Sequence, residues 1–92
     1  MVNDTTQSRY RLGSTPRGDL LFYDGPRVIE IGVSTHRSAE GVEIILFGRS
    51  LRQWQYPHHD DPLTQEIKDE ILHQAARLLT AQDARARTKI EW

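Results

Sequence analysis

The run His58-His59-Asp60-Asp61 places four side chains that can bind a metal ion in consecutive positions. Imidazole nitrogens and carboxylate oxygens are ligands of zinc and related ions, and His36 and His73 offer two further imidazoles. Zinc sites usually draw their ligands from separated elements, because adjacent residues rarely converge on one ion. The spacing therefore favours a hydrophilic loop over a metal site. The acids of such a loop would lie near the start of a helix, where negative charge is stabilising.

Serine, histidine and acidic residues, the groups used by many hydrolases, are also present. The sequence contains Ser34, Ser38 and Ser50 as well as His36 and His58. None of these serines lies in a Gly-x-Ser-x-Gly pattern, and there is no His-Glu-x-x-His or Gly-rich phosphate-binding motif. Because no pattern predicts catalysis, we expect a protein that is not an enzyme and that uses no cofactor.

Charge is distributed unevenly toward the end of the chain. Between residues 60 and 70 a single base, Lys68, accompanies the acids Asp60, Asp61, Glu66, Asp69 and Glu70. Residues 77–89 show the reverse, with the bases Arg77, Arg85, Arg87 and Lys89 against Asp83. Acids at the start of a helix and bases at its end complement the helix dipole, which explains part of the pattern. The acidic group is also a surface suited to a cationic partner, because complementary charge speeds association.

Three aromatic side chains lie outside the predicted strands and helix or at the end of the chain, namely Trp54, Tyr56 and Trp92. Such residues either cover a small core or serve as anchors for a partner. For Trp54 we expect a core position. For Tyr56 both interpretations stay open, and we include it among the candidate partner-binding residues.

The element that must position the acidic residues is an amphipathic helix predicted over residues 63–79. Its apolar side chains recur at steps of four, four and three, at Ile67, Ile71, Ala75 and Leu78. Thr64 is a suitable N-cap, because its hydroxyl can accept a hydrogen bond from the first turn. Residues 80–87 contain three alanines and are compatible with an extension of the helix.

Upstream of this helix, three segments have the apolar patterns of strands, at residues 20–23, 27–33 and 42–47. Asp24-Gly25-Pro26 predicts a reversal between the first two. Residues 10–12 and 88–92 are compatible with one further strand each, whereas 34–41 and 48–61 are predicted to be loops. Apolar residues on both sides of the 42–47 segment indicate a central position in the sheet.

The composition is that of one folded domain spanning residues 1–92, with residues 1–8 expected to be disordered. The 92 residues include 37% apolar and 27% charged side chains, and there is no cysteine to form a disulfide. Strands followed by one amphipathic helix predict an α+β fold, with an antiparallel sheet of three to five strands and the helix packed on one face. The start of the chain lacks the apolar core of a signal peptide and no segment approaches a membrane span, so we expect a cytoplasmic protein.

The region from the end of the third strand onward has Trp54, Pro57, the polar run at 58–61, Pro62, Thr64, Glu66 and Ile71 in that order. This arrangement resembles small bacterial immunity proteins of polymorphic toxin systems, in which a Trp is followed by Pro, a polar turn and a helix that opens with Thr or Ser and acids. The resemblance covers roughly residues 20–92. It departs from the family in the turn, where His-His-Asp-Asp replaces an Asp-Gly kind of turn.

The resemblance implies a non-enzymatic inhibitor that binds a cognate toxin and occludes its active site. Since nuclease toxins tend to present basic clefts, we expect the contact at the candidate residues Asp60, Asp61, Glu66, Asp69, Glu70 and Tyr56. The alternative is a small nucleic-acid-associated or regulatory domain that uses Arg52, Arg77, Arg85 and Arg87. Against it stands the formal charge of −1, from 13 acids and 12 bases, because nucleic-acid binders need an excess of positive charge. The oligomeric state is open at this point.

Overall fold

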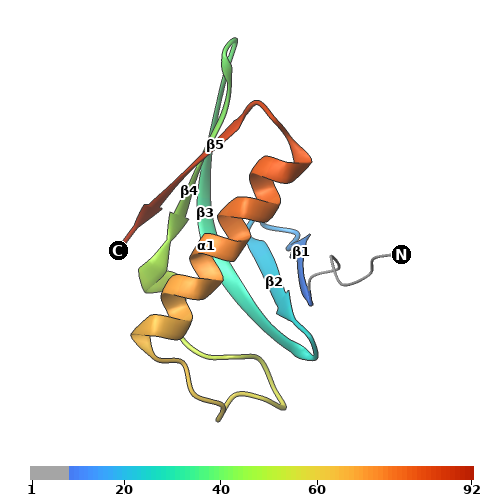
Figure 1. Cartoon of the computed structure of the whole chain (residues 1–92), viewed down its shortest axis with the longest axis vertical. Helices are drawn as coiled ribbons and strands as arrows, with labels where there is room; N and C mark the ends of the chain where they lie inside the picture. Colours follow the sequence, from blue (N-terminus) through green and yellow to red (C-terminus); the bar gives the residue numbers. More distant parts are fainter. Residues whose placement is uncertain (1–8) are drawn as a thin grey trace, which may run out of the picture.

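The structure is a computed structural model that describes residues 9–92, and it consists of a five-stranded sheet with one long helix on one face (Figure 1). The strands are β1 (Tyr10–Ser14), β2 (Leu20–Asp24), β3 (Arg27–Ser38), β4 (Gly41–Phe47) and β5 (Ala86–Glu91). A short 3-10 turn, η2 (Gly48–Ser50), follows β4, and the helix is α1 (Gln65–Gln82). The predicted α+β fold class is confirmed. The prediction of disorder for residues 1–8 lies outside the described residues.

The order of the strands in the sheet follows their order in the chain. β1 to β4 form an antiparallel meander, whereas β5 pairs with β4 in parallel. The sheet is therefore mixed, where we expected antiparallel pairing throughout. The reason is α1, which carries the chain back along the sheet so that β5 starts at the same end as β4. β4 lies between β3 and β5, as the apolar residues on both of its sides predicted.

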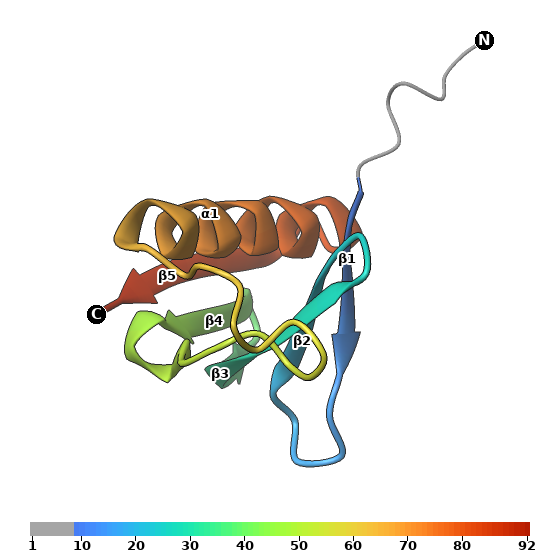
Figure 2. The ribbon, with the colours of Figure 1, turned by 90° about the horizontal axis from the view of Figure 1, so that it is seen from below.

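The strand register separates the sheet into a face that packs against α1 and an open face. Phe22 pairs with Ile29, and Leu46 pairs with Ile90, so these side chains share the helix-facing side. α1 lies along this side and makes its most extensive strand contact with β5 (Figure 2). The buried core consists of Phe22, Ile29, Ile31, Leu46, Leu51, Trp54, Ile71, Leu72, Ala75 and Leu79. The predicted packing of the helix stripe on the strand side chains is confirmed.

The helix begins at Gln65, directly after the predicted N-cap Thr64 and two residues later than the start of the predicted segment. Thr64 has extended backbone geometry, and its Oγ1 accepts a hydrogen bond from the backbone N–H of Ile67 at 3.2 Å, as an N-cap does. The helix continues beyond Leu79 to Gln82, which confirms part of the possible extension. It ends there because residues 83–85 turn the chain into β5.

Residues 34–38 belong to β3, so the prediction of a loop over 34–41 is wrong for most of its length. The extension pairs with β4, with His36 opposite Glu43 and Ser38 opposite Gly41. Polar residues here do not alternate with apolar ones because the end of this hairpin is exposed on both faces. Gly41 has a φ of +143°, and a Cβ at this position would overlap the carbonyl oxygen of Arg85. The glycine thus permits both the tight turn and the close approach of the start of β5.

The loop between η2 and α1 contributes to the core. Trp54 is fully buried, as predicted, and its Nε1 donates a hydrogen bond to the carbonyl oxygen of Pro62 at 3.1 Å. The backbone N–H of Gln55 donates to the carbonyl oxygen of Val28 at 2.8 Å, which fixes the loop to β3. Within the described residues, no helix is both long and apolar enough to cross a membrane.

Candidate partner-binding surface

Tyr56 is the most exposed large hydrophobic side chain of the described residues, at 84%. Its ring stacks on the imidazole of His59, with centroids 5.3 Å apart and an interplanar angle of 20°. Two successive turns shape this segment, because the N–H of His58 donates to the carbonyl of Gln55 and the N–H of Asp61 donates to that of His58, both at 2.9 Å. The Tyr56–Pro57 peptide bond is cis.

The base of this exposed segment is held from several directions. Trp54 and the Gln55 backbone tie it to the core and to β3, as described above. Arg27, the first residue of β3, places its guanidinium carbon 4.4 Å from the centroid of a Trp54 ring. Tyr56 therefore projects from a supported loop, and little conformational freedom has to be lost when a partner covers it.

A chain of ionic contacts runs beneath the loop. Asp24 is 8% exposed, and its two carboxylate oxygens form ion pairs with Arg9 and Arg27. Nε of Arg9 lies 2.6 Å from Oδ1, and Nη2 of Arg27 lies 2.8 Å from Oδ2. The Asp24 carboxylate raises the pKa of Arg9. Arg27 Nη1 lies 3.8 Å from an oxygen of Asp61, and Nδ1 of His58 lies 3.4 Å from the same oxygen. Asp61 is thus engaged within the protein and is less available to a partner than the sequence suggested.

Asp60 differs from its neighbour. Its side chain is 94% exposed, and its one ionic contact within residues 9–92 is with His59 at 3.8 Å. Tyr56, His59 and Asp60 therefore form a compact exposed group, which we call the loop patch.

The acids of α1 lie on the outer side of the helix and are only partly brought together. Glu66 and Glu70 are one turn apart, are both exposed, and form no ion pair within residues 9–92. Glu70 accepts a hydrogen bond from the Gln74 amide at 2.8 Å. Asp69 is half-buried and is rotated by about 100° from Glu70 around the helix axis. We call Glu66 and Glu70 the helix patch.

The loop patch precedes the first turn of α1, in the yellow part of the ribbon at the lower end of Figure 1. The helix patch follows in the orange turns above it. The predicted acidic surface is therefore divided in two. Its exposed acids are Asp60 in the loop patch and Glu66 and Glu70 in the helix patch, whereas Asp61 and Asp69 are half-buried.

The four arginines of the alternative hypothesis do not form one surface. Arg77 lies on the outer side of α1, and Arg87 lies on the open face of the sheet, because Ala86 and Ile90 of β5 turn toward the helix. Arg85 donates a hydrogen bond to the carbonyl oxygen of Ala39 at 3.0 Å. Arg52 lies in the loop after η2, beside a polar hollow of about 270 Å³ on the open face.

The four histidines do not converge on a common metal site within the described residues. Within residues 9–92 no group of three histidine, cysteine or acidic side chains is arranged to hold a metal ion. His58 contacts Asp61 and His59 contacts Asp60, each as an exposed or half-exposed pair. His73 Nδ1 lies 2.7 Å from the carbonyl oxygen of Asp69 on its own helix.

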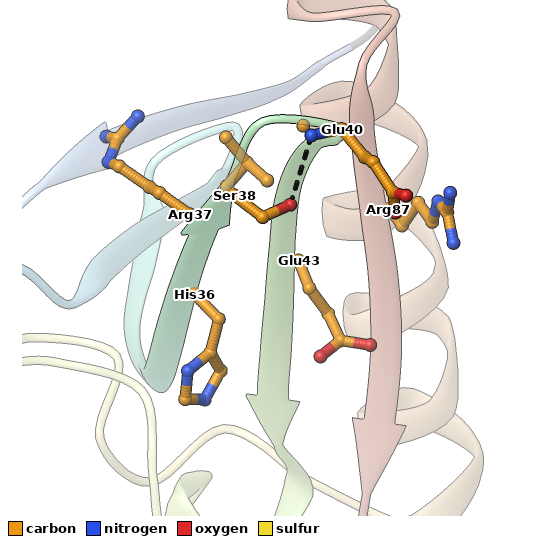
Figure 3. Close-up of a pocket in the computed structure, with 8 residues that line it drawn as sticks. His36, Arg37, Ser38, Glu40, Glu43 and Arg87 are labelled. Carbon is orange, nitrogen blue, oxygen red and sulfur yellow. Dashed lines mark hydrogen bonds between the residues drawn. The ribbon is translucent and has the colours of Figure 1, made fainter.

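The sequence did not reveal a groove of about 280 Å³ at the end of the β3–β4 hairpin (Figure 3). Its polar lining includes His36, Ser38, Glu40, Glu43 and Arg87. His36 and Glu43 extend from neighbouring strands on the same side of the sheet, and Nε2 of His36 lies 3.4 Å from Oγ of Ser34. The groove could have been predicted from the pairing of residues 34–38 with residues 41–45, which places His36 opposite Glu43. This pairing was not predicted because residues 34–41 were assigned to a loop. These side chains are exposed to water, as expected of the outer end of a hairpin.

In comparisons with protein-family models, curated proteins and solved structures, the chain matches none of them. The residues and their geometry therefore carry the functional inference.

Proposed function

We propose that this protein is an immunity protein that binds a cognate toxin in the cytoplasm and occludes its active site. The observation that carries the proposal is the loop patch, in which an aromatic side chain that is 84% exposed projects from a supported loop beside an exposed carboxylate. Tyrosine is enriched among the residues that dominate protein–protein binding energy. The resemblance in the order Trp54, Pro57, polar turn and helix supports the same class of function.

The helix patch suggests the chemistry of the partner. Glu66 and Glu70 form no ion pair within the described residues, so their negative charge is available to an approaching protein. A basic cleft, such as nuclease toxins tend to present, would approach this surface faster and bind it more tightly at low salt. The toxin would contact Tyr56 in the centre of the interface and the carboxylates around it.

The test uses the product of the neighbouring gene as the candidate toxin. The two proteins are co-expressed, and their binding is measured by titration calorimetry at low and high salt. We expect rescue of growth and a Kd that rises with salt. Tyr56→Ala should raise Kd by about tenfold or more, because a central aromatic anchor is worth about 2 kcal/mol. Trp92→Ala is the control, since Trp92 is also exposed but follows β5, where its ring lies against Gly48.

The charge contribution is tested with a matched pair of double variants. Glu66→Lys with Glu70→Lys should weaken binding and reduce its salt dependence. Glu40→Lys with Glu43→Lys makes the same change in net charge at the hairpin end of the sheet and should leave binding unchanged. Equal effects of the two double variants would contradict the proposed surface. A salt-dependent shift with generic DNA, without binding to the neighbouring gene product, would favour the nucleic-acid alternative and contradict the proposal.

A further inference from the structure

Within residues 9–92, the outer edge of β5 pairs with no other strand. β5 pairs with β4 on one side only, and residues 87–91 make no backbone hydrogen bond outside that pairing in the part of the chain from residue 9 to 92. α1 packs on a face of β5 and leaves its edge uncovered (Figures 1 and 2). The strand contains no proline. A row of unpaired N–H and C=O groups of this kind is a template for another strand.

The side chains of β5 determine which strand can pair there. The side chains that point toward the open face are those of Arg87, Lys89 and Glu91. Lys89 Nζ lies 3.6 Å from a carboxylate oxygen of Glu91. The side chains that point toward the helix are those of Thr88 and Ile90, both half-buried. Charged edge side chains repel an unmatched strand but accept one whose charges are opposite at the same positions.

A second copy of β5 meets this requirement in one antiparallel register. With Ile90 on a two-fold axis, Lys89 of each copy faces Glu91 of the other, and Thr88 faces Trp92. Moving the axis to Lys89 brings two lysines together, and moving it to Glu91 brings two glutamates together. A shift that places the axis between residues puts charged side chains opposite apolar ones, because successive residues point to opposite faces. In the register with Ile90 on the axis, each charged side chain that meets a charged side chain of the other copy meets one of opposite sign. None of the other registers has this property.

We propose that the protein forms a two-fold dimer through antiparallel pairing of β5 with β5 of a second copy, with Ile90 on the axis. The two five-stranded sheets then form one continuous sheet, and both helices lie on the same face. Trp92, which is 51% exposed, is partly covered by Thr88 of the second copy. An interface made of one strand from each copy belongs to the weak class of interfaces, which bury less than about 1,200 Å². The dimer therefore exchanges with monomer as the protein concentration changes. This inference does not depend on the proposed function.

The experiment is sedimentation velocity over a series of concentrations, on the wild type, Lys89→Glu, Glu91→Lys and an equimolar mixture of the two variants. We expect a reversible monomer–dimer equilibrium for the wild type. Each variant alone should dimerise more weakly by about tenfold or more, because two opposite-charge pairs become like-charge pairs. The mixture should regain the wild-type dimer, since the two acids on β5 of one chain then face the two bases on β5 of the other.

Recovery on mixing separates a contact between chains from a role within one chain, because a folding defect is not repaired by a second defective variant. Glu40→Lys is the control for the change of charge, and circular dichroism confirms that each variant is folded. A wild type that stays monomeric at every concentration overturns the proposal, as does a mixture no better than its components. If dimerisation were weakened by Glu91→Lys but not by Lys89→Glu, Lys89 would lie on the axis, and the proposed register would be overturned. Species larger than a dimer would show that a different edge is used and would overturn the proposal.

Discussion

The guanidinium of Arg27 lies over a ring of Trp54, with its carbon 4.4 Å from the ring centroid, and this contact joins the start of β3 to the loop that carries Tyr56. The same guanidinium binds Asp24 at 2.8 Å and reaches Asp61 at 3.8 Å. One side chain therefore connects a buried tryptophan, a buried carboxylate and the surface loop. The exposed residues of the loop patch depend on this connection for their position.

Removing the Asp24 carboxylate, which pairs with both Arg9 and Arg27, should destabilise the fold. Asp24→Ala leaves Arg27, whose side chain is 27% exposed, without its closest partner. We expect the free energy of unfolding to fall by about 2–4 kcal/mol, as for other partly buried pairs that lose one member. Urea denaturation measures the change.

The control for Asp24→Ala is Glu30→Gln. Glu30 lies 3.9 Å from Arg17, whose side chain is 84% exposed, so this ion pair should contribute no more than about 0.5 kcal/mol. Similar losses in the two variants would show that the buried position of Asp24 is unimportant.

Trp54 should contribute to stability through both its volume and its hydrogen bond. Trp54→Phe removes the donor to the Pro62 carbonyl and part of a fully buried ring. We expect a loss of about 1–3 kcal/mol in the free energy of unfolding. Because Trp92 is the other tryptophan, the fluorescence of this variant also reports Trp92 alone. A stability equal to that of the wild type would contradict the core position of Trp54.

Two glycines with positive φ should respond differently to alanine. Gly18 has a φ of +95° and open space where a Cβ would be, so Gly18→Ala should cost about 1 kcal/mol from backbone strain alone. Gly41→Ala adds an overlap with the carbonyl oxygen of Arg85 and should cost at least about 1 kcal/mol more. Thermal unfolding of both variants measures the difference, and equal melting temperatures would show that the start of β5 moves freely away from Gly41.

The helix N-cap offers a test of the predicted start of α1. Thr64→Ala removes the acceptor of the Ile67 N–H and should lower the free energy of unfolding by about 1 kcal/mol. Thr64→Ser keeps the hydroxyl and should change it by only a few tenths of a kcal/mol. An alanine variant as stable as the serine variant would mean that water replaces the cap at no cost.

The sequence predicted those parts of the fold in which burial imposes a period. Ile29 and Ile31 alternate because one face of β3 is covered, and Ile71 and Ala75 recur at helical spacing because one side of α1 is covered. Trp54 was also assigned to the core correctly. In each case the pattern reflects contact with the interior.

Features without a covered face were missed. His36 lies in the exposed end of β3, where neither side of the strand is buried, so no alternation marks it. The parallel direction of β5 depends on the path of α1 across the sheet, which no local pattern contains. The engagement of Asp61 by Arg27 joins residues far apart in the chain, and an acidic run alone does not show which member has a partner.

Because the order of strands in the sheet repeats their order in the chain, most of the sheet can form through contacts between neighbours in sequence. The pairing of Val42 with Ala86 is different, because it must enclose η2, the loop and all of α1. Closing that long segment carries the largest entropic cost of the topology, so we expect it to be the slow step of folding. Until it occurs, the β1–β4 meander has its apolar side uncovered, and this intermediate is the species most exposed to aggregation.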